Sequence, residues 1–354
     1  MSRPSDPPTQ PGRWVAVHLF HQGDLDTLLL DAVAPALTGL AQAGRIHGHF
    51  FLRYWEGGPH LRVRVLTGEP AQPVQPVQSM HNGSQDIATE LVDRWNAWLG
   101  DHPSPRSVDE AAYLRFATEA ATREGLPGYE PWRGLHDRAE VRDYLPEHGR
   151  YGTGASLAAV ERHFMEASRC AEAILARRPG PAERLSAGFA VSLLTWAVVE
   201  PDPRRRLDAL RTGAEAWRRM LGPAYDTEAF DRAYESGRGA LVRRAGHLLA
   251  PEPRPRSDGP TGPIAAWRLS VSRLYASLEA LENKGEFTPD LGALRDDPSL
   301  LGLPSPRAAL TANRCAHLMC NRLGLYGPQE ALLRHFAARA AADLHTAGSG
   351  AHRP

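Results

Sequence analysis

The pattern of hydrophobic and polar positions divides the chain into a short N-terminal part with strand-like alternation and a long part with helical spacing. Residues 14–20 are β-branched and aromatic, which predicts a strand. Asp24 can cap a following helix, and Pro35 is expected to kink or split that helix. Residues 46–55 and 60–66 flank a four-residue Gly/Pro turn, which predicts a β-hairpin.

Beyond the hairpin, helical spacing dominates. Residues 156–177 form a clear amphipathic pattern, and the apolar run 186–199 is too short to cross a bilayer, so we interpret it as part of a buried core helix. Further helices are expected near residues 183–200, 206–221, 227–249, 265–283, 306–323 and 328–344. These elements predict an α+β fold, with a mainly antiparallel sheet near the N-terminus followed by a largely helical body.

Low-complexity segments mark the ends and one internal position. Residues 1–13 are Pro-rich and expected to be disordered, residues 67–86 are interpreted as a solvated insertion, and residues 346–354 as a flexible tail.

Charge and cysteine content exclude several classes of protein. The 41 basic residues balance the 41 acidic ones, which argues against nucleic acid and membrane partners. Three cysteines cannot build a disulfide framework, and the N-terminus lacks the apolar stretch of a signal peptide. We therefore expect a cytoplasmic protein.

The hairpin carries the first candidate site. Alternation places His60, Arg62 and Arg64 on one face of their strand. With a four-residue turn, Trp55 would lie opposite His60 and Arg53 opposite Arg62. Because like charges placed opposite each other destabilise a sheet, these arginines require a carboxylate partner or an anionic ligand. The alternative is a solvated face on which the charges stay apart.

Two later segments contain polar residues whose spacing is compatible with acid–base chemistry. Glu147 and Arg150 flank a short turn and could form an acid–base pair, although spacing alone favours a surface ion pair. On a helix, Asn313, His317 and Asn321 would form one polar stripe. His317 could then serve as a general base or acid, whereas a hydrogen-bonded structural histidine is the commoner case.

One further residue is a catalytic candidate, and the absence of several known motifs excludes common enzyme classes. Tyr275 lies on a predicted helix and could donate a proton, although a packing tyrosine is commoner there. The chain contains no P-loop, no GxGxxG after a strand, no GxSxG, no HExxH and no metal-like ligand spacing. We therefore expect neither a cofactor nor a metal.

Three segments together resemble one family. FFLRYWEGGPHLRVR, YLPEHGRYGTG and HLMCNRL occur in the order seen in the C-terminal domain of class I lantibiotic dehydratases and its stand-alone relatives in thiopeptide biosynthesis. The resemblance runs from Trp14 to about residue 340 and implies one catalytic domain over residues 14–345. Thr153, Ala167 and Leu318 depart from the family pattern, and the larger module that glutamylates Ser/Thr is missing.

The resemblance implies a ribosomally made precursor peptide, leader plus dehydrated core, as substrate. One family activity eliminates glutamate from glutamylated Ser/Thr; the other joins two dehydroalanines in a formal aza-[4+2] cycloaddition that ends in a pyridine-centred macrocycle. The implied catalytic residues are His317, Arg62, Arg64, Glu147, Arg150 and Tyr275. The implied substrate-binding residues are Arg53, Tyr54, Trp55, His60, Ser272, Asn321 and Arg322.

The cyclase reading is preferred, because the chain stands alone and its RYWEGGPH turn is similar to the stand-alone thiopeptide proteins. Glutamate elimination and a non-catalytic leader-binding module stay open as alternatives. The resemblance leads us to expect that Arg62 and His317 face one cavity. The oligomeric state is left open, with a homodimer among the options.

Overall fold

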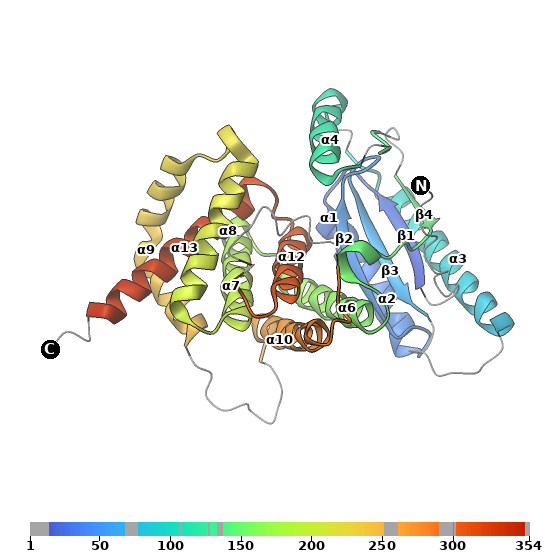
Figure 1. The fold of residues 1–354 in the computed structure, drawn as a ribbon. Helices are drawn as coiled ribbons and strands as arrows, with labels where there is room; N and C mark the ends of the chain where they lie inside the picture. Colours follow the sequence, from blue (N-terminus) through green and yellow to red (C-terminus); the bar gives the residue numbers. More distant parts are fainter. Residues whose placement is uncertain are drawn as a thin grey trace. The chain divides into compact units, whose positions relative to one another are not determined.

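The computed structural model describes residues 14–67, 77–105, 108–126, 128–132, 137–250, 261–289, 300 and 302–350. The chain divides into two compact units, residues 1–146 and 147–354. The first unit contains a sheet with flanking helices, and the second is helical (Figure 1), which confirms the predicted α+β fold. The extension of one catalytic domain over residues 14–345 stays a prediction. The segment 1–13 lies outside the described residues.

The sheet of the first unit has four antiparallel strands in the order β2-β3-β1-β4 (Figure 1). The strands are β1 (Trp14–Phe20), β2 (Gly48–Tyr54), β3 (His60–Leu66) and β4 (Arg138–Arg142). The first three confirm the predicted strand and hairpin. The strand β4 was not predicted, because its five residues, RAEVR, form a short edge strand with weak alternation.

The helical segment after β1 does not break at Pro35. It changes from an α-helix to a π-helix and back. It runs through α1 (Leu25–Thr27), the π-helical η1 (Leu28–Val33) and α2 (Ala34–Gln42). Asp24 caps it as predicted, since its carboxylate accepts the N–H of Asp26 at 3.0 Å. The N–H of Ala34 bonds to the carbonyl of Leu29, five residues back. The expected interruption at Pro35 is thus a π-turn directly before the proline.

Two further helices complete the first unit. The long helix α3 (Val77–Asp101) contacts β1 and β4, and its Trp95 indole donates to the carbonyl of Ala32 at 3.3 Å. Since α3 begins at Val77, the second half of the predicted insertion 67–86 is helical; residues 68–76 lie outside the described residues. The helix α4 (Glu110–Glu124) packs its alanines against Trp55.

The second unit contains every helix that the spacing predicted beyond residue 155 (Figure 1). Its helices are α5 (His148–Tyr151), α6 (Ala155–Leu175), α7 (Pro181–Val199), α8 (Pro203–Leu221), η2 (Gly222–Ala224), α9 (Thr227–Leu249), α10 (Pro263–Asn283), α12 (Pro306–Arg322) and α13 (Pro328–Gly350). The helix at the end of the chain continues to Gly350, so residues 346–350 of the expected flexible tail are helical, and residues 351–354 lie outside the described part.

The apolar helix α7 is the centre of this unit. Among the described residues it is the helix that is long and apolar enough to cross a membrane by length and composition. It is mostly buried and contacts α9, α10, α12 and α13, as predicted for a core helix. A Cβ at Gly188 would lie 2.7 Å from the Leu333 side chain, so α13 can approach α7 closely only where a glycine stands.

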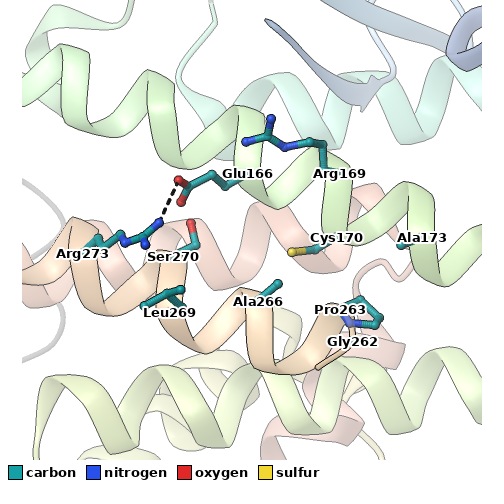
Figure 2. Close-up of a pocket in the computed structure, with 10 residues that line it drawn as sticks. All are labelled: Glu166, Arg169, Cys170, Ala173, Gly262, Pro263, Ala266, Leu269, Ser270 and Arg273. Carbon is teal, nitrogen blue, oxygen red and sulfur yellow. Dashed lines mark ion pairs between the residues drawn. The ribbon is translucent and has the colours of Figure 1, made fainter. Parts of the chain in front are cut away.

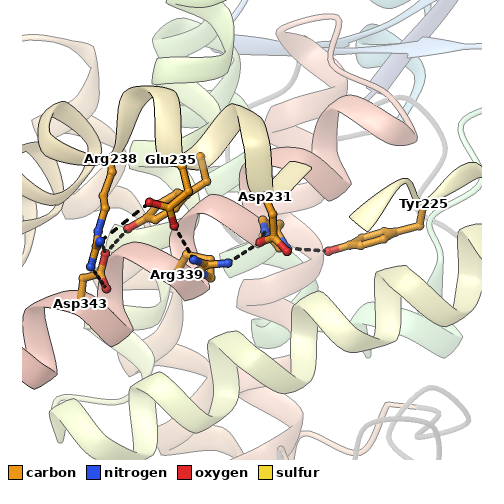
Figure 3. Close-up of polar contacts among 8 residues, drawn as sticks. Tyr225, Asp231, Glu235, Arg238, Arg339 and Asp343 are labelled. Atoms are coloured by element: carbon orange, nitrogen blue, oxygen red, sulfur yellow. Dashed lines mark hydrogen bonds and ion pairs between the residues drawn. The ribbon is translucent and has the colours of Figure 1, made fainter. Parts of the chain in front are cut away.

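A polar network ties α9 to α13 (Figure 3). The imidazole of His335 lies 3.1 Å from the Tyr225 hydroxyl and 3.0 Å from Asp231. Arg339 contacts Asp231 and donates to Glu235 at 2.7 Å. Asp343 accepts hydrogen bonds from Tyr234 and Arg238. Most of these side chains bridge the two helices, so the network fixes their relative register.

Candidate functional site

The register of the sheet gathers cationic and aromatic side chains on one face, here called the polar face. On β3, His60, Arg62 and Arg64 share this face. On the neighbouring strand β1, His18 lies opposite Arg62 and Phe20 opposite His60. The prediction of a shared face for the β3 residues is therefore confirmed. His60 and Arg64 are buried, and Arg62 is partly buried, so this face is not the fully solvated alternative.

Arg62 is held by three neighbours from its own hairpin. Its guanidinium lies 3.3 Å from the centre of the Tyr54 ring. It donates to the Glu56 carboxylate at 2.9 Å and approaches the His60 ring nitrogen at 3.3 Å. Glu56 is thus the carboxylate partner that the predicted cluster of arginines required.

Arg64 and His18 form the more deeply buried part of the polar face. A guanidinium nitrogen of Arg64 lies 3.1 Å from the His18 ring. Burial, and then the charge of Arg62, lowers the pKa of Arg64 to about 10. Burial, and then the charge of Arg64, lowers the pKa of His18 far below its usual range. At neutral pH the pair is therefore a cation beside a neutral imidazole.

The predicted hairpin register is wrong by one residue. The turn has five residues, 55–59, so that Tyr54 lies opposite His60 and Leu52 opposite Arg62. Because a one-residue slip exchanges the two faces of a strand, Arg53 points away from the polar face. It makes a buried ion pair with Asp26 there. Its position therefore gives no support to the predicted substrate-binding role.

Trp55 also lies in the interior. It sits in the turn, 9% exposed, beneath α4, where the Tyr113 hydroxyl donates to its carbonyl at 2.5 Å. Tyr54 keeps the position that a binding role requires, on the polar face with Arg62 stacked against it.

In the second unit, His317 is paired with a buried carboxylate. Its side chain is 51% exposed on α12, and its Nδ1 lies 2.7 Å from the carboxylate of Glu330 on α13. Glu330 is fully buried and also accepts from Arg334 at 2.7 and 3.0 Å. Arg334 in turn donates to Asn313 at 3.0 Å. The predicted Asn313–His317 stripe therefore belongs to one network across two helices.

Glu330 stays ionised in this network. Burial acts to raise the pKa of Glu330, but the charges and hydrogen bonds of His317 and Arg334 outweigh burial and lower it. The ring of Trp217 on α8 lies 6.0 Å from the His317 ring and adds an apolar neighbour.

The other predicted catalytic residues differ in their surroundings. Glu147 and Arg150 form an ion pair at 2.9 Å with both side chains 52% exposed, the surface pair that spacing alone favoured. Tyr275 is buried on α10, and burial, followed by nearby glutamates, raises its pKa to about 12. Its hydroxyl therefore stays protonated at neutral pH and can donate a hydrogen bond. Ser272 on the same helix donates to the carbonyl of Arg268.

Two predicted binding residues lie near the end of α12. Asn321 is half-buried one helical turn after His317. Arg322 is fully buried, bonds to the Ser168 hydroxyl on α6 at 3.1 Å, and lies 5.4 Å from the Phe164 ring. Burial lowers its pKa to about 10, so it remains a cation inside the helical core. This position indicates a structural role rather than contact with a substrate.

A groove of about 470 Å³ lies between α6 and α10 (Figure 2). Glu166 and Arg273 form an ion pair across it at 3.5 Å, and Cys170 and Ser270 are among its lining residues. Burial raises the pKa of Cys170 to about 11. The groove therefore offers apolar surface and hydrogen bonds, and its thiol remains protonated at neutral pH.

Behind this groove, His163 makes folding stability depend on pH. It is buried, bonds to Ser270 at 2.8 Å, and burial lowers its pKa from 6.5 to about 3. As pH falls below 6.5 the unfolded chain gains a proton there and the folded chain does not, so stability is lost. Between pH 7 and 5 this loss should be about 2 kcal/mol. Urea unfolding of His163→Gln should show a correspondingly weaker pH dependence.

The matched control is Phe164→Leu, a core substitution at the next position without a titrating group. It should lower the unfolding free energy by a similar amount at both pH values and keep the wild-type slope. An equal slope in wild type and His163→Gln would contradict the prediction.

Sequence reasoning missed the partners that complete these clusters, namely His18, Asp26, Glu56, Glu330 and Arg334. One signal was available for the last two. They form an i, i+4 acid–base pair on a helix face whose other members, Ala337 and Ala341, are buried. Charges on an apolar face indicate a buried network rather than a solvated pair.

The fold and these clusters place the chain among known proteins. The profile of the family described as lantibiotic biosynthesis dehydratase C-term matches residues 14–341. The chain therefore belongs to this family, as its three sequence motifs indicated. A comparison with curated proteins gives no match.

Several solved structures share the fold. The pyridine synthase TbtD from thiomuracin biosynthesis is 23% identical, with 95% of this chain and 99% of that chain covered and a TM-score of 0.72. TsrL is 19% identical, with 96% and 99% covered and a TM-score of 0.65. The tRNA-dependent lantibiotic dehydratase MibB from Microbispora sp. 107891 is 21% identical, with a TM-score of 0.52. This chain aligns over 97% of its length with 29% of MibB.

Proposed function

We propose that this protein is a peptide-modifying enzyme that forms a pyridine-centred macrocycle by joining two dehydroalanines of a precursor peptide. Membership in the lantibiotic dehydratase C-terminal family supports a role in the biosynthesis of ribosomally made, modified peptides, with a precursor peptide as substrate. The type of reaction is our inference from the two polar clusters.

The choice of reaction rests on the contacts that Arg62 already makes within the protein. Its charge is matched by Glu56, and its guanidinium plane is stacked on Tyr54. A glutamylated substrate brings a carboxylate and needs a cation that can pair with it, whereas azole rings and dehydroalanines are flat and neutral. A stacked arginine that is already paired with a carboxylate, beside His60, fits the second kind of substrate better.

The reaction needs positioning and proton transfer. Two carbon–carbon bonds close a six-membered ring between one dehydroalanine and the iminol tautomer of the other. Loss of water, and of the leader peptide as its amide, then makes the ring aromatic without an oxidant. Holding the two partners in contact supplies much of the rate. The pair of His317 and Glu330 can move the protons that the iminol and the dehydration require. The protonated Tyr275 hydroxyl can donate a hydrogen bond to the substrate.

Glutamate elimination is the second candidate, because one observation also supports it. A histidine paired with a buried carboxylate can take the Cα proton of a glutamylated residue. Arg62 and Arg64 would then stabilise the leaving carboxylate and the developing enolate. For this reaction Glu56 would have to release Arg62 to the substrate. The surface pair of Glu147 and Arg150 would have to join the site from its exposed position.

A non-catalytic module is the third reading. Within the described residues, β2 forms one edge of the sheet, and an extended leader peptide could add to that edge through backbone hydrogen bonds. This mode would bind the leader without changing its mass.

One incubation separates the three. The purified protein is mixed with a dehydrated, azole-bearing precursor peptide and, separately, with a glutamylated one, and both are followed by mass spectrometry. The proposal expects release of the leader amide and a macrocycle with new pyridine absorbance from the first peptide. Loss of glutamate from the second peptide alone would establish elimination instead. Leader binding with no mass change in either would leave only the binding module.

A further inference from the structure

We propose that Glu330 is the positioning residue of this enzyme, holding the proton of His317 on Nδ1 so that Nε2 is the atom that exchanges protons with the substrate. The inference rests on the proposed function in that His317 must act on a peptide. The contact itself can be tested without turnover.

The geometry assigns one nitrogen of His317 to the protein. Nδ1 lies 2.7 Å from a Glu330 oxygen, a distance typical of a charge-assisted hydrogen bond. An ionised carboxylate only accepts hydrogen bonds, so the proton must lie on Nδ1. In the neutral ring Nε2 is then the basic nitrogen. An imidazole in water mostly carries its proton on the other nitrogen, so this tautomer has to be imposed.

The carboxylate is itself fixed in place. Glu330 is completely buried, and its second oxygen accepts both Nε and Nη2 of Arg334. Arg334 is anchored by Asn313 and lies 5.4 Å from the Trp217 ring. Burying a carboxylate costs folding free energy unless it is paired, so Glu330 depends on its partners. The exposed pair of Glu147 and Arg150 has no such requirement.

The charges around His317 favour its protonated form as an intermediate. Glu330 and Arg334 are the charged groups that contact the network from α13. Cys320 on α12 is neutral, because burial raises its pKa well above its usual range. When Nε2 takes a proton from the substrate, the resulting imidazolium faces an anion, and the proton can return from Nε2 to the leaving group.

The first test is the tautomer of His317 in the intact wild-type protein, measured by ¹⁵N–¹H NMR and assigned with His317→Gln. We expect Nδ1 protonated and Nε2 unprotonated in the neutral ring. In Glu330→Gln the pH midpoint of the His317 titration should fall by about 1 or more, because the imidazolium loses an adjacent anion. A neutral wild-type ring with its proton on Nε2 would overturn the proposal, and this result does not depend on a folded Glu330 variant.

The second test is kinetic and uses the dehydrated, azole-bearing precursor peptide. Glu330→Gln should lower kcat by about 100-fold, leave KM within about threefold, and move the acid limb of the pH–rate profile to lower pH. Glu330→Asp, which keeps the charge but shortens its reach, should recover part of kcat. Asp343→Asn is the matched control, because it removes a carboxylate paired with Arg238 farther along α13.

The two proposals fail in different ways. If wild type converts no precursor peptide but shows the expected tautomer, the proposed function fails and the positioning of His317 stands. If wild type converts the peptide and a folded Glu330→Gln protein keeps the wild-type kcat and pH profile, the positioning role is refuted. A fall in kcat equal to that of Asp343→Asn, with the pH profile unmoved, would also refute it.

Discussion

His317→Gln is expected to lose turnover of the precursor peptide by about 10²- to 10⁴-fold, the range that general acid–base groups contribute. Glutamine is a polar side chain of similar reach but cannot take up a proton. The side chain is half exposed, so the fold should survive the change. Turnover is measured by mass spectrometry of the core peptide, and leader binding by fluorescence polarisation with a labelled leader.

The control is His247→Gln, which replaces an exposed histidine on α9. It should keep wild-type turnover and leader affinity. If His317→Gln converts the peptide within about threefold of wild type, His317 is a structural residue. If leader affinity falls together with turnover, the residue acts in binding rather than in proton transfer.

Asp26→Ala is expected to destabilise the protein by about 3–5 kcal/mol, because it leaves the Arg53 guanidinium buried without its carboxylate. Both side chains of this pair are less than a tenth exposed. The pair joins the segment α1 to the face of β2 that lies opposite the polar face. The measurement is the free energy of unfolding in urea at pH 7.

The double variant Asp26→Leu/Arg53→Met tests the cause of that loss. It replaces both charges with apolar side chains of similar size, so it should recover most of the stability lost by Asp26→Ala. A loss below about 1 kcal/mol for Asp26→Ala would show that the pair is solvated in solution. A double variant less stable than the single one would point to steric fit instead of charge.

The hairpin shows what the alternation of polar and apolar residues can predict about a strand and what it cannot. The pattern of HLRVRVL was sufficient to place three polar side chains on one face, because period 2 is a property of the strand itself. The partner register was not predictable, because Trp55 is aromatic and was assigned to the strand although it belongs to the turn. That single residue exchanged the faces of β2 and moved Arg53 from the predicted site to the core.

The partners of the candidate residues were beyond sequence reasoning for a different reason. Spacing on one helix predicted the stripe of Asn313 and His317, but Glu330 joins it from α13 through tertiary packing. The same holds for His18, which reaches Arg64 only through the pairing of β1 with β3. The predicted meeting of Arg62 and His317 around one cavity stays a prediction.

The π-helical turn over Leu28–Val33 makes the length of this segment critical. A π-turn holds one residue more than the α-helical turn it replaces, so deleting one residue there would restore an unbroken α-helix. Each residue rotates an α-helix by about 100°. The deletion would therefore rotate α1 by that angle around the helix axis, relative to α2. Asp26 would then leave Arg53. A homologue that lacks this extra residue should therefore also lack the carboxylate that Asp26 supplies here. Among homologues, an insertion or deletion in this helix should accompany the loss or gain of an arginine at the position of Arg53 on β2.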